Sequence, residues 1–384
     1  MGLTPPHTLG MLGVHAAAAT LALLPAAALT AEQPQQVLEK RPELVLSVQQ
    51  PAPGTTAAAA AGSEALPFAS IHEARDHIRV LRRRALRLAR FRVAIGPGVY
   101  PPLRLEPEDS GSADAPVIYE GRQGASLSAG VHVPPSAFKK WDGHPNVVQA
   151  DLSSLGLTYG EMGAGGDNGG TCTQFTKARL FFENRTQILA RWPNVQSFDP
   201  STYQWQKIGV GGADGFTIND TATVARASKW AAEAAPWVHI YGQYDWSDIW
   251  APVNISVGSD HATITGTGAI KLGQAKFYAA NLLSELDAPH EYWIDEAKHT
   301  LYFYPPVPLE QWTEGVFISQ NMTAANVTAD HITLRNIGIR HSRGTGVVGM
   351  NVTGLRVENC DISGHGQHGV AIVGNKSGVD HVDR

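Results

Sequence analysis

A repeat of 23 residues near the C-terminus constrains the fold more than any other feature of the chain. When residues 332–348 are placed over residues 355–371, apolar residues fall on apolar residues and alternate with polar ones inside each segment. A repeat of this length, with strands and no helix, is typical of stacked coils in a parallel β-helix, where each coil buries Val and Ile against the next. The sequence therefore predicts an all-β fold of this type.

The alignment also predicts two side-chain pairs between neighbouring coils. Asn336 falls on Asn359, and stacked amides of this kind form ladders in stacked β-structures. Arg335 falls on Glu358, which places opposite charges on adjacent strands. Both pairs require the 23-residue register, so they test the alignment directly.

Two glycine-rich segments inside the repeat match a nucleotide-binding pattern. The segments 344–349 and 364–369 both fit G-x-G-x-x-G, but this pattern binds a pyrophosphate only where the loop opens a helix. The residues after Gly369 read VAIVGN, which is a strand pattern. We therefore interpret these glycines as turn residues of the repeat.

Composition agrees with a chain of strands and tight turns. Of the 384 residues, 39 are glycine and only 17% are charged, which fits strands better than a helical bundle. The net charge of −5 gives no general attraction for nucleic acid. The two cysteines, Cys172 and Cys360, could pair or be free, and they make no disulfide framework.

The N-terminal residues favour export. Residues 11–24 are a short apolar run followed by small residues, which indicates a signal peptide over residues 1–31 and is too short for a transmembrane segment. An Ala-rich transit peptide is the alternative. Seven Asn-x-Ser/Thr sequons are present where roughly two would occur by chance, which favours a glycosylated, secreted protein. The candidate glycosylation sites are Asn184, Asn219, Asn254, Asn321, Asn326, Asn351 and Asn375.

The remaining segments are distinguished by composition and periodicity. A helix is expected from Ile71 to Leu88, because apolar residues recur at steps of three and four and Ser70 and Glu73 form a capping box. Its arginine-rich face is either a solvated face or a site for phosphate or acidic glycan. The predicted organisation is a signal peptide (1–31), a disordered Pro/Ala-rich linker (32–66), a cap helix with the first coils (67–137), an inserted β-rich module holding all nine tryptophans (138–320) and the repeat coils (321–384).

Several segments resemble a family of carbohydrate-active proteins. SIHEARDHIRVLRR and the strands after it are similar to the N-terminal part of bacterial and algal right-handed β-helix proteins. RLFFENRTQILARWPN (179–194) and KFYAANLLSELDAPHEYWIDEAKHTLYFYPP (276–306) resemble the inserted module of glycoside hydrolase family 141 and its relatives. The segments PH and EAKHT depart from the Pro-Gly and Gly turns of those relatives.

The resemblance covers about residues 68–384 and carries specific implications. It implies a right-handed parallel β-helix of the pectate-lyase type that is secreted, needs no cofactor and acts on complex plant or algal polysaccharide. Fucosidase and xylanase activities are associated with the family. The family's catalytic acids come from later coils and have no counterpart here, so the resemblance implies a fragment or a truncated homologue. The catalytic residues stay unknown.

The segment from Glu285 to Pro306 combines five acids with five aromatic residues, a composition that also suits a sugar-cleaving site. The alternation of Tyr292 and Ile294, and of Leu301 and Phe303, predicts a β-hairpin with a polar turn. The acids of the turn are expected to be solvated, and those before it to cap or orient the segment. We interpret the segment as scaffold that could also support the rim of a sugar cleft.

The chain was searched for two carboxyl groups on neighbouring coils, because glycoside hydrolysis needs a pair about 5–9.5 Å apart and adjacent strands lie about 4.8 Å apart. Asp361 is expected to face outward, but its counterpart one coil earlier is Gly338. No acid pair is found. The candidate sugar contacts are Trp192, Trp293, His341, Asp361, His365 and His368. The histidines and Asp361 also fit a metal site, but turn histidines that hydrogen-bond to solvent or to a sugar hydroxyl are the preferred interpretation.

Three functions fit these observations. The first is a secreted glycoside hydrolase-like protein that acts on or binds polysaccharide, with its catalytic acids beyond residue 384. The second is a non-catalytic glycan-binding or cell-surface structural protein, which needs no acid pair. The third is a polysaccharide lyase, which needs Lys or Arg as base and often calcium. The expected partner is a polysaccharide or oligosaccharide, with no nucleic acid, and the chain is expected to be a monomer.

Overall fold

The computed structural model describes residues 43–51, 62–84, 89–160, 165–166, 176–212, 215–241, 247–250, 253–266, 275–374 and 381–382. The predicted signal peptide, Cys172 and Asn375 lie outside these ranges. Within them no helix is long and apolar enough to cross a membrane.

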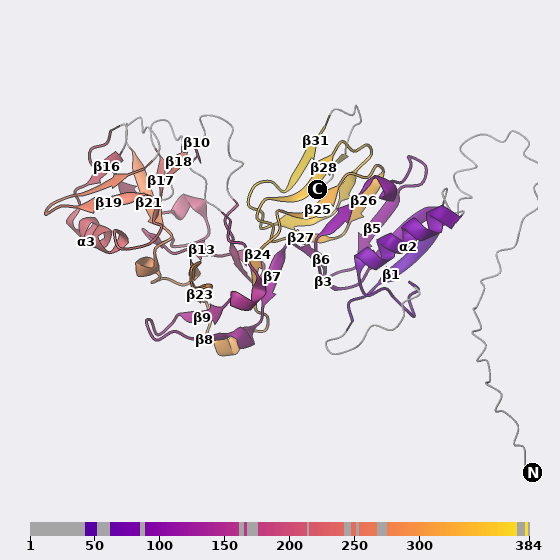
Figure 1. The fold of residues 1–384 in the computed structure, drawn as a ribbon, viewed down its shortest axis with the longest axis horizontal. Helices are drawn as coiled ribbons and strands as arrows, with labels where there is room; N and C mark the ends of the chain where they lie inside the picture. The colour runs from indigo at the N-terminus through magenta and orange to yellow at the C-terminus, as the bar shows by residue number, and fades with distance from the viewer. Residues whose placement is uncertain are drawn as a thin grey trace, which may run out of the picture. The chain divides into compact units, whose positions relative to one another are not determined.

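Three sheets made entirely of parallel pairs form one part of the fold (Figure 1). The first sheet contains β1 (Glu43–Val48), β2 (Arg90–Ile95), β5 (Val117–Gly121), β26 (Ile332–Arg335), β29 (Arg356–Glu358) and β32 (His381–Val382). The second contains β3 (Gly98–Tyr100), β6 (Ala125–Ser128), β27 (Gly338–Arg340) and β30 (Asp361–Ser363). The third contains β4 (Leu103–Leu105), β25 (Thr323–Val327), β28 (Thr345–Met350) and β31 (Val370–Val373).

The chain visits the three sheets in turn, so one coil contributes one strand to each sheet. β25 pairs with both β4 and β28, which completes the coil that β5 and β6 begin. Residues 129–322, called here the inserted region, therefore form an excursion from a single coil. The range 138–320 expected from the sequence lies within it.

The 23-residue register is confirmed. Leu334 pairs with Val357, and the Nε of Arg335 donates to Glu358 at 2.8 Å. At the next corner the side-chain amide of Asn359 donates to the side-chain oxygen of Asn336 at 2.6 Å. Both asparagines adopt left-handed backbone conformations (φ 50° and 56°), which asparagine tolerates better than most residues.

The interior of the coils is filled by the inward side chains of these strands, among them Val93, Leu127 and Ile339. α2 (Ile71–Arg84) buries Ile71, Ala74 and Ile78 against the same core, as its periodicity predicted. Of the predicted capping box, the bond to Ser70 is present, whereas Glu73 accepts from the residue before Ser70 and not from Ser70 itself. The backbone N–H of Glu73 donates to the Ser70 hydroxyl, and the Glu73 carboxylate accepts from the N–H of Ala69.

Two arginines of α2, Arg79 and Arg82, have partners within the protein. Arg79 binds both carboxylate oxygens of the buried Asp109, at 2.6 and 2.7 Å. The guanidinium of Arg82 lies over the ring of Phe91. These contacts favour a structural role for this face over a site for phosphate or acidic glycan.

One part of the predicted linker is ordered structure. β1 lies within residues 32–66 and pairs in parallel with β2, and its residues Leu46 and Val48 are buried. The prediction of disorder is therefore wrong for Glu43–Val48. Pro, Gln and Ala dominate the surrounding composition, and they masked a short run, ELVLSV, that has the alternation of a strand.

Among its described residues, the inserted region contains four further sheets and one α-helix (Figure 1). One sheet contains β7 (Gly130–Val133), β24 (Val316–Ser319), β11 (Leu180–Phe182) and β12 (Arg185–Thr186). A second sheet contains β8 (Phe138–Lys140), β9 (Val148–Asp151), β23 (Thr300–Phe303), β22 (Glu291–Asp295) and β13 (Ile188–Leu189). The others contain β10 (Gly165–Gly166), β18 (Ser247–Trp250), β17 (Trp237–Tyr241), β21 (Lys276–Ala280), β14 (Arg191–Trp192) and β15 (Gln206–Lys207), and β16 (Gly215–Ile218), β20 (Ala262–Thr265) and β19 (Asn254–Val257). The helix is α3 (Thr221–Trp230).

Short 3-10 helices connect these strands at η2 (Pro135–Ala137), η3 (Ser153–Leu155), η5 (Pro200–Thr202), η7 (Leu283–Glu285) and η8 (Leu309–Gln311). A further one, η1 (Pro107–Asp109), lies between β4 and β5 of the coils. The inserted region has hydrophobic cores of its own. One contains Leu180, Tyr292 and Val316, and another contains Trp230 and Phe277. The inserted region is therefore stabilised separately from the coils.

Candidate functional site

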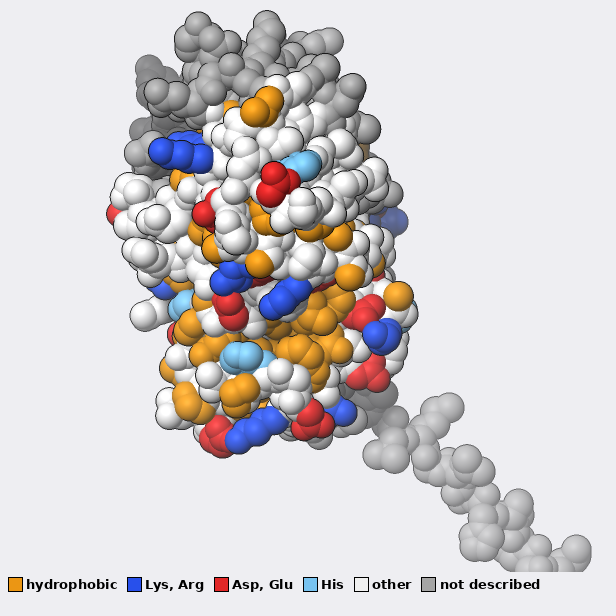
Figure 2. Space-filling view, turned by 90° about the vertical axis from the view of Figure 1, so that its left-hand side faces the viewer, with side chains coloured by type: hydrophobic (Ala, Val, Ile, Leu, Met, Phe, Trp, Pro, Cys, Tyr) orange, Lys and Arg blue, Asp and Glu red, His pale blue; other side chains and the backbone are white. Residues whose placement is uncertain are grey.

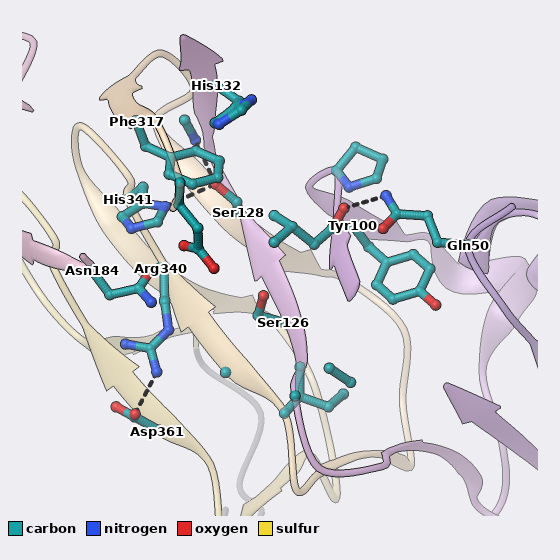
Figure 3. A pocket seen from close by; sticks show the side chains of 18 of the residues that line it. Gln50, Tyr100, Ser126, Ser128, His132, Asn184, Phe317, Arg340, His341 and Asp361 are labelled. Atoms are coloured by element: carbon teal, nitrogen blue, oxygen red, sulfur yellow. Dashed lines mark hydrogen bonds and ion pairs between the residues drawn. The ribbon is translucent and has the colours of Figure 1, made fainter. Parts of the chain in front are cut away.

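An open groove of about 890 Å³ lies over the second parallel sheet. Its floor is formed by outward side chains of the coils, including Ser126, Ser128 and Asp361. Its opposite wall comes from the inserted region, where His132 lies on β7 and Phe317 on β24 (Figure 3). The groove is thus shared between the two parts of the fold.

The parallel register decides which side chains reach the groove floor. Ser126, Gly338 and Asp361 occupy one outward column, and Ser128, Arg340 and Ser363 occupy the next. The residues between these columns point into the coil core. A Cβ atom at Gly338 would lie 3.0 Å from the Cβ of Ser126, so glycine keeps this column open beside Asp361.

Arg340 and Asp361 form the charged centre of the groove floor. An Nη of Arg340 lies 2.5 Å from Asp361 Oδ2 (Figure 3). The other Nη donates to the Ser363 hydroxyl at 2.7 Å. The side chain of Asp361 is 65% exposed, so the predicted outward orientation is confirmed. Its column contains no second acid, as the sequence alignment indicated.

Glu314 is a second carboxylate that lines the groove, and sequence reasoning missed it. It precedes β24 in the inserted region, where no repeat relates it to Asp361. Asn184, also on the groove wall, lies in the turn between β11 and β12. Only the packing of the inserted region against the coils brings these residues to the groove.

His341 lies between the groove and the inserted region. Its Nδ1 is 2.9 Å from the hydroxyl of Ser128, beside Phe317 (Figure 3). The ring of His341 stacks on Phe317 and also contacts Phe181, each with ring centroids 4.6 Å apart. Burial, followed by the nearby positive charge of Arg340, lowers the pKa of His341 to about 3. The imidazole is therefore neutral at ordinary pH.

The backbone of His341 is also unusual. Its φ of 63° is in the left-handed region, and the equivalent residue one coil later is a glycine, Gly364, with φ 74°. A histidine in this conformation is uncommon. It is held here by the two phenylalanine rings and Ser128, so His341 links the coils to the inserted region.

Two predicted residues lie near the groove without lining it. His365 Nδ1 is 2.7 Å from the Ser342 hydroxyl and its Nε2 is 3.1 Å from the carbonyl of Ile339. Burial is the main reason why its pKa falls to about 4. His368 is exposed in the loop after β30.

The two predicted tryptophans lie in the inserted region, away from the groove lining. Trp192 packs near Trp230, at a ring distance of 6.0 Å, with the Arg226 guanidinium over its ring. Trp293 lines a different hollow, described below. The six candidate sugar contacts therefore do not form one site.

The predicted hairpin is confirmed, with Tyr292 opposite Phe303 and Asp295 opposite Thr300. Two of its neighbouring acids are buried, contrary to the usual preference of carboxylates for solvent. Glu285 accepts from the indole N–H of Trp230 at 2.7 Å and pairs with Arg226, and burial raises its pKa. These contacts support the interpretation of the segment as scaffold.

Glu291 is the second buried acid. It accepts backbone N–H groups of Asp287 and Ala288 at 3.2 Å each. Burial outweighs these hydrogen bonds and raises its pKa to about 8.

Among the described residues no group of three or more His, Cys, Asp or Glu side chains could hold a metal ion.

Comparison with known proteins agrees with the architecture. No protein family matches the sequence, and no curated protein matches it. A solved structure described as a glycoside hydrolase is similar at a TM-score of 0.65 and 15% identity, covering 86% of this chain and 63% of that protein. This chain therefore has a glycoside hydrolase-like fold and spans less than two thirds of that protein's length.

A second solved structure is described as the complex structure of XylC with xylose. Its TM-score is 0.35 at 12% identity, covering 84% of this chain and 41% of that one. This likeness is too low to indicate a shared fold.

Proposed function

We propose that this protein is a secreted, carbohydrate-active protein of the right-handed parallel β-helix type. We further propose that it binds complex polysaccharide in the groove over the second parallel sheet. The observation that carries the proposal is the groove itself, where hydroxyl and amide side chains lie beside the rings of Tyr100 and Phe317 and the Arg340–Asp361 pair. The glycoside hydrolase-like fold supports the same class of ligand.

The β-helix assignment is supported by the order in which the chain visits the three sheets. Each coil adds one strand to each sheet, and all of these pairs are parallel. Crossover connections between parallel strands are almost always right-handed. A groove along such coils can follow an extended polymer, because each coil adds a further row of outward side chains.

The groove chemistry suits a polysaccharide. The hydroxyl of Ser126 and the side-chain amide of Gln50 can exchange hydrogen bonds with sugar hydroxyls, since hydroxyl and amide groups both donate and accept. The ring of Phe317, which packs between His341 and His132, adds apolar surface to the groove. Asp361 and Ser363 hold the side chain of Arg340 in place. Binding of a ligand therefore costs less side-chain conformational entropy at Arg340.

Hydrolysis and binding without turnover remain separate candidate functions. Hydrolysis requires two carboxyl groups on either side of the scissile bond. Asp361 and Glu314 both line the groove, but Asp361 is paired with Arg340 and its column holds no second acid. These contacts favour a groove that binds polysaccharide without cleaving it. If the protein is a hydrolase, we place its catalytic acids outside the described residues. A lyase would need Arg340 as its base, and Arg340 is a donor to Asp361 and Ser363.

Secretion is supported by the positions of the sequons. Five of them are solvent-exposed, as attachment of a glycan requires: Asn184, Asn219, Asn254, Asn321 and Asn351. Asn326 lies half-buried on β25, so we expect no glycan there. Mass spectrometry of the protein exported from a eukaryotic host tests both statements.

The test of the proposed function is a binding and turnover assay on one set of polysaccharides. Affinity electrophoresis against xylan, pectin, fucoidan and β-glucan measures binding, and release of reducing ends measures hydrolysis. We expect retarded migration with at least one of them, and weaker retardation for Arg340→Ala. Glu310→Ala, a change at an exposed residue outside the groove, is the control.

The outcomes separate the candidates. Binding with release of reducing ends supports a hydrolase, and binding without release supports the non-catalytic function. Ultraviolet-absorbing unsaturated products would show a lyase. Equal migration with and without every polysaccharide would contradict the proposal.

A further inference from the structure

A second hollow, of about 840 Å³, lies in the inserted region and is separate from the groove. Its lining includes Trp141, which follows β8, and Trp293 on the outward face of β22. The remainder comes from the residues after α3, from the segment around η7 and from the hairpin turn. No residue lines both the hollow and the groove.

The two tryptophans of the hollow are supported from behind by one tyrosine. Tyr302 is the cross-strand partner of Trp293, with ring centroids 5.8 Å apart, and it meets Trp141 edge-on at 4.9 Å. All three side chains are only partly buried. Figure 2 shows hydrophobic side chains gathered on one face of the molecule, with acidic and basic side chains at their margin. Large hydrophobic patches on a protein surface often mark binding sites.

The acids around the hollow already have partners. Lys177 pairs with Glu296, and Lys298 pairs with Asp295 at 3.0 Å. Both oxygens of Glu233 accept backbone N–H groups, from Leu283 at 2.6 Å and from Ser284 at 2.8 Å. Asp287 accepts from the side chain of Asn194 at 2.7 Å. The hollow therefore offers no unpaired carboxylate to a cation, and a neutral ligand fits it best.

Aromatic faces together with hydrogen-bonding groups match a particular ligand chemistry. The faces of a sugar ring carry C–H groups that pack on an indole, while its hydroxyls lie at the ring edge. Ser284 and Lys177 provide hydrogen-bonding groups at the lining of the hollow. A volume of this size lies in the range of pockets for small ligands, roughly 300–1,000 Å³.

We propose that this hollow is a second carbohydrate-binding site, which takes a neutral oligosaccharide segment by stacking it on Trp293 and Trp141. The proposal rests on the proposed function, because it assigns to the hollow another segment of the polymer that the groove binds. Two sites on one chain raise the affinity for a long polymer, since binding at one site increases the effective concentration at the other.

The test is isothermal titration calorimetry with xylohexaose, cellohexaose and mannohexaose on the full chain. For at least one of them we expect two molecules bound per chain. Trp293→Ala is expected to weaken one site about 10-fold, the loss expected when about 1.4 kcal/mol of stacking and burial is removed. Trp293→Phe, which keeps an aromatic face, is expected to retain both sites. Arg340→Ala is expected to weaken the other site.

A second measurement uses the unmodified protein and avoids any effect of the variants on folding. Tryptophans are oxidised with N-bromosuccinimide with and without the hexasaccharide, and the modified residues are located by mass spectrometry. We expect the sugar to protect Trp141 and Trp293. Trp205, which packs on Tyr278 outside the hollow, is the internal control and is expected to react equally in both samples.

The results distinguish the two proposals. If Arg340→Ala loses a binding site, Trp293→Ala does not, and the sugar does not protect Trp293, the proposed site in the hollow is wrong. The proposed site in the groove would then stand. Loss only in Trp293→Ala would support the hollow and overturn the groove. No binding of any hexasaccharide and no protection would overturn the second site, whereas the polysaccharide assay decides the groove separately.

Discussion

The coils and the inserted region are stabilised by different kinds of contact. In the coils each strand lies beside an equivalent strand of the next coil, as Leu334 lies opposite Val357, 23 residues later in the chain. In the inserted region nothing repeats, and buried acids such as Glu285 and Glu291 satisfy single indole, guanidinium and backbone groups. The coils therefore depend on periodic apolar packing, and the inserted region depends on individual polar contacts.

The largest expected effect that tests this difference is at Glu285. Glu285→Ala leaves the buried indole N–H of Trp230 without its acceptor and removes the partner of Arg226. We expect a loss of about 3 kcal/mol in the free energy of unfolding, as for other broken buried ion pairs. Urea unfolding followed by tryptophan fluorescence measures it. A loss no greater than that of Glu310→Ala, at an exposed pair, would show that the buried acid is dispensable.

The second prediction concerns the pH dependence of stability at Glu291. Its pKa is raised to about 8 in the folded protein, so the folded state binds more protons than the unfolded state between about pH 4.5 and pH 8. Stability should therefore fall as the pH rises through this range. Glu291→Gln should flatten the slope of the melting temperature against pH. An unchanged slope in the variant would assign the dependence to other groups.

The pH dependence of stability that His341 causes should have the opposite sign to that of Glu291. The pKa of His341 is lowered to about 3, so the unfolded state binds more protons between about pH 3 and pH 6.5. Stability should fall as the pH decreases through this range. His341→Asn keeps a residue that tolerates the left-handed backbone and should reduce the loss in acid, measured by thermal melts. If the His341→Asn variant loses as much stability in acid as the unmodified protein, protonation of His341 is not the cause of that loss.

The smallest expected effect is at the asparagine ladder of the coils. Asn359→Gly loses the hydrogen bond to Asn336 but keeps the left-handed backbone free of strain, at a cost of about 1 kcal/mol. Asn359→Ala loses the bond and also strains the backbone, at about 1 kcal/mol more. Chemical denaturation of the two variants measures the difference. Equal stability of both would show that the corner tolerates other residues.

The sequence could predict those parts of the fold in which contacts recur or are local. The register of the coils, the Asn336–Asn359 pair, the capped helix and the hairpin of Tyr292 and Phe303 all follow from repeats, alternation or neighbouring residues. It misjudged Glu43–Val48, because composition over a window of 35 residues outweighed a strand of 6 residues.

By itself, then, the sequence determined which residues face into and out of the coils, including the outward Asp361, because strand periodicity is a property of the chain. Only the tertiary structure decided that Glu314, Asn184 and Phe317 join Asp361 in one groove. Only the tertiary structure buried Glu285 and Glu291 and placed Trp293 beside Trp141. These arrangements depend on how a non-repeating region packs on a repeating one, and no periodic signal along the chain records that packing.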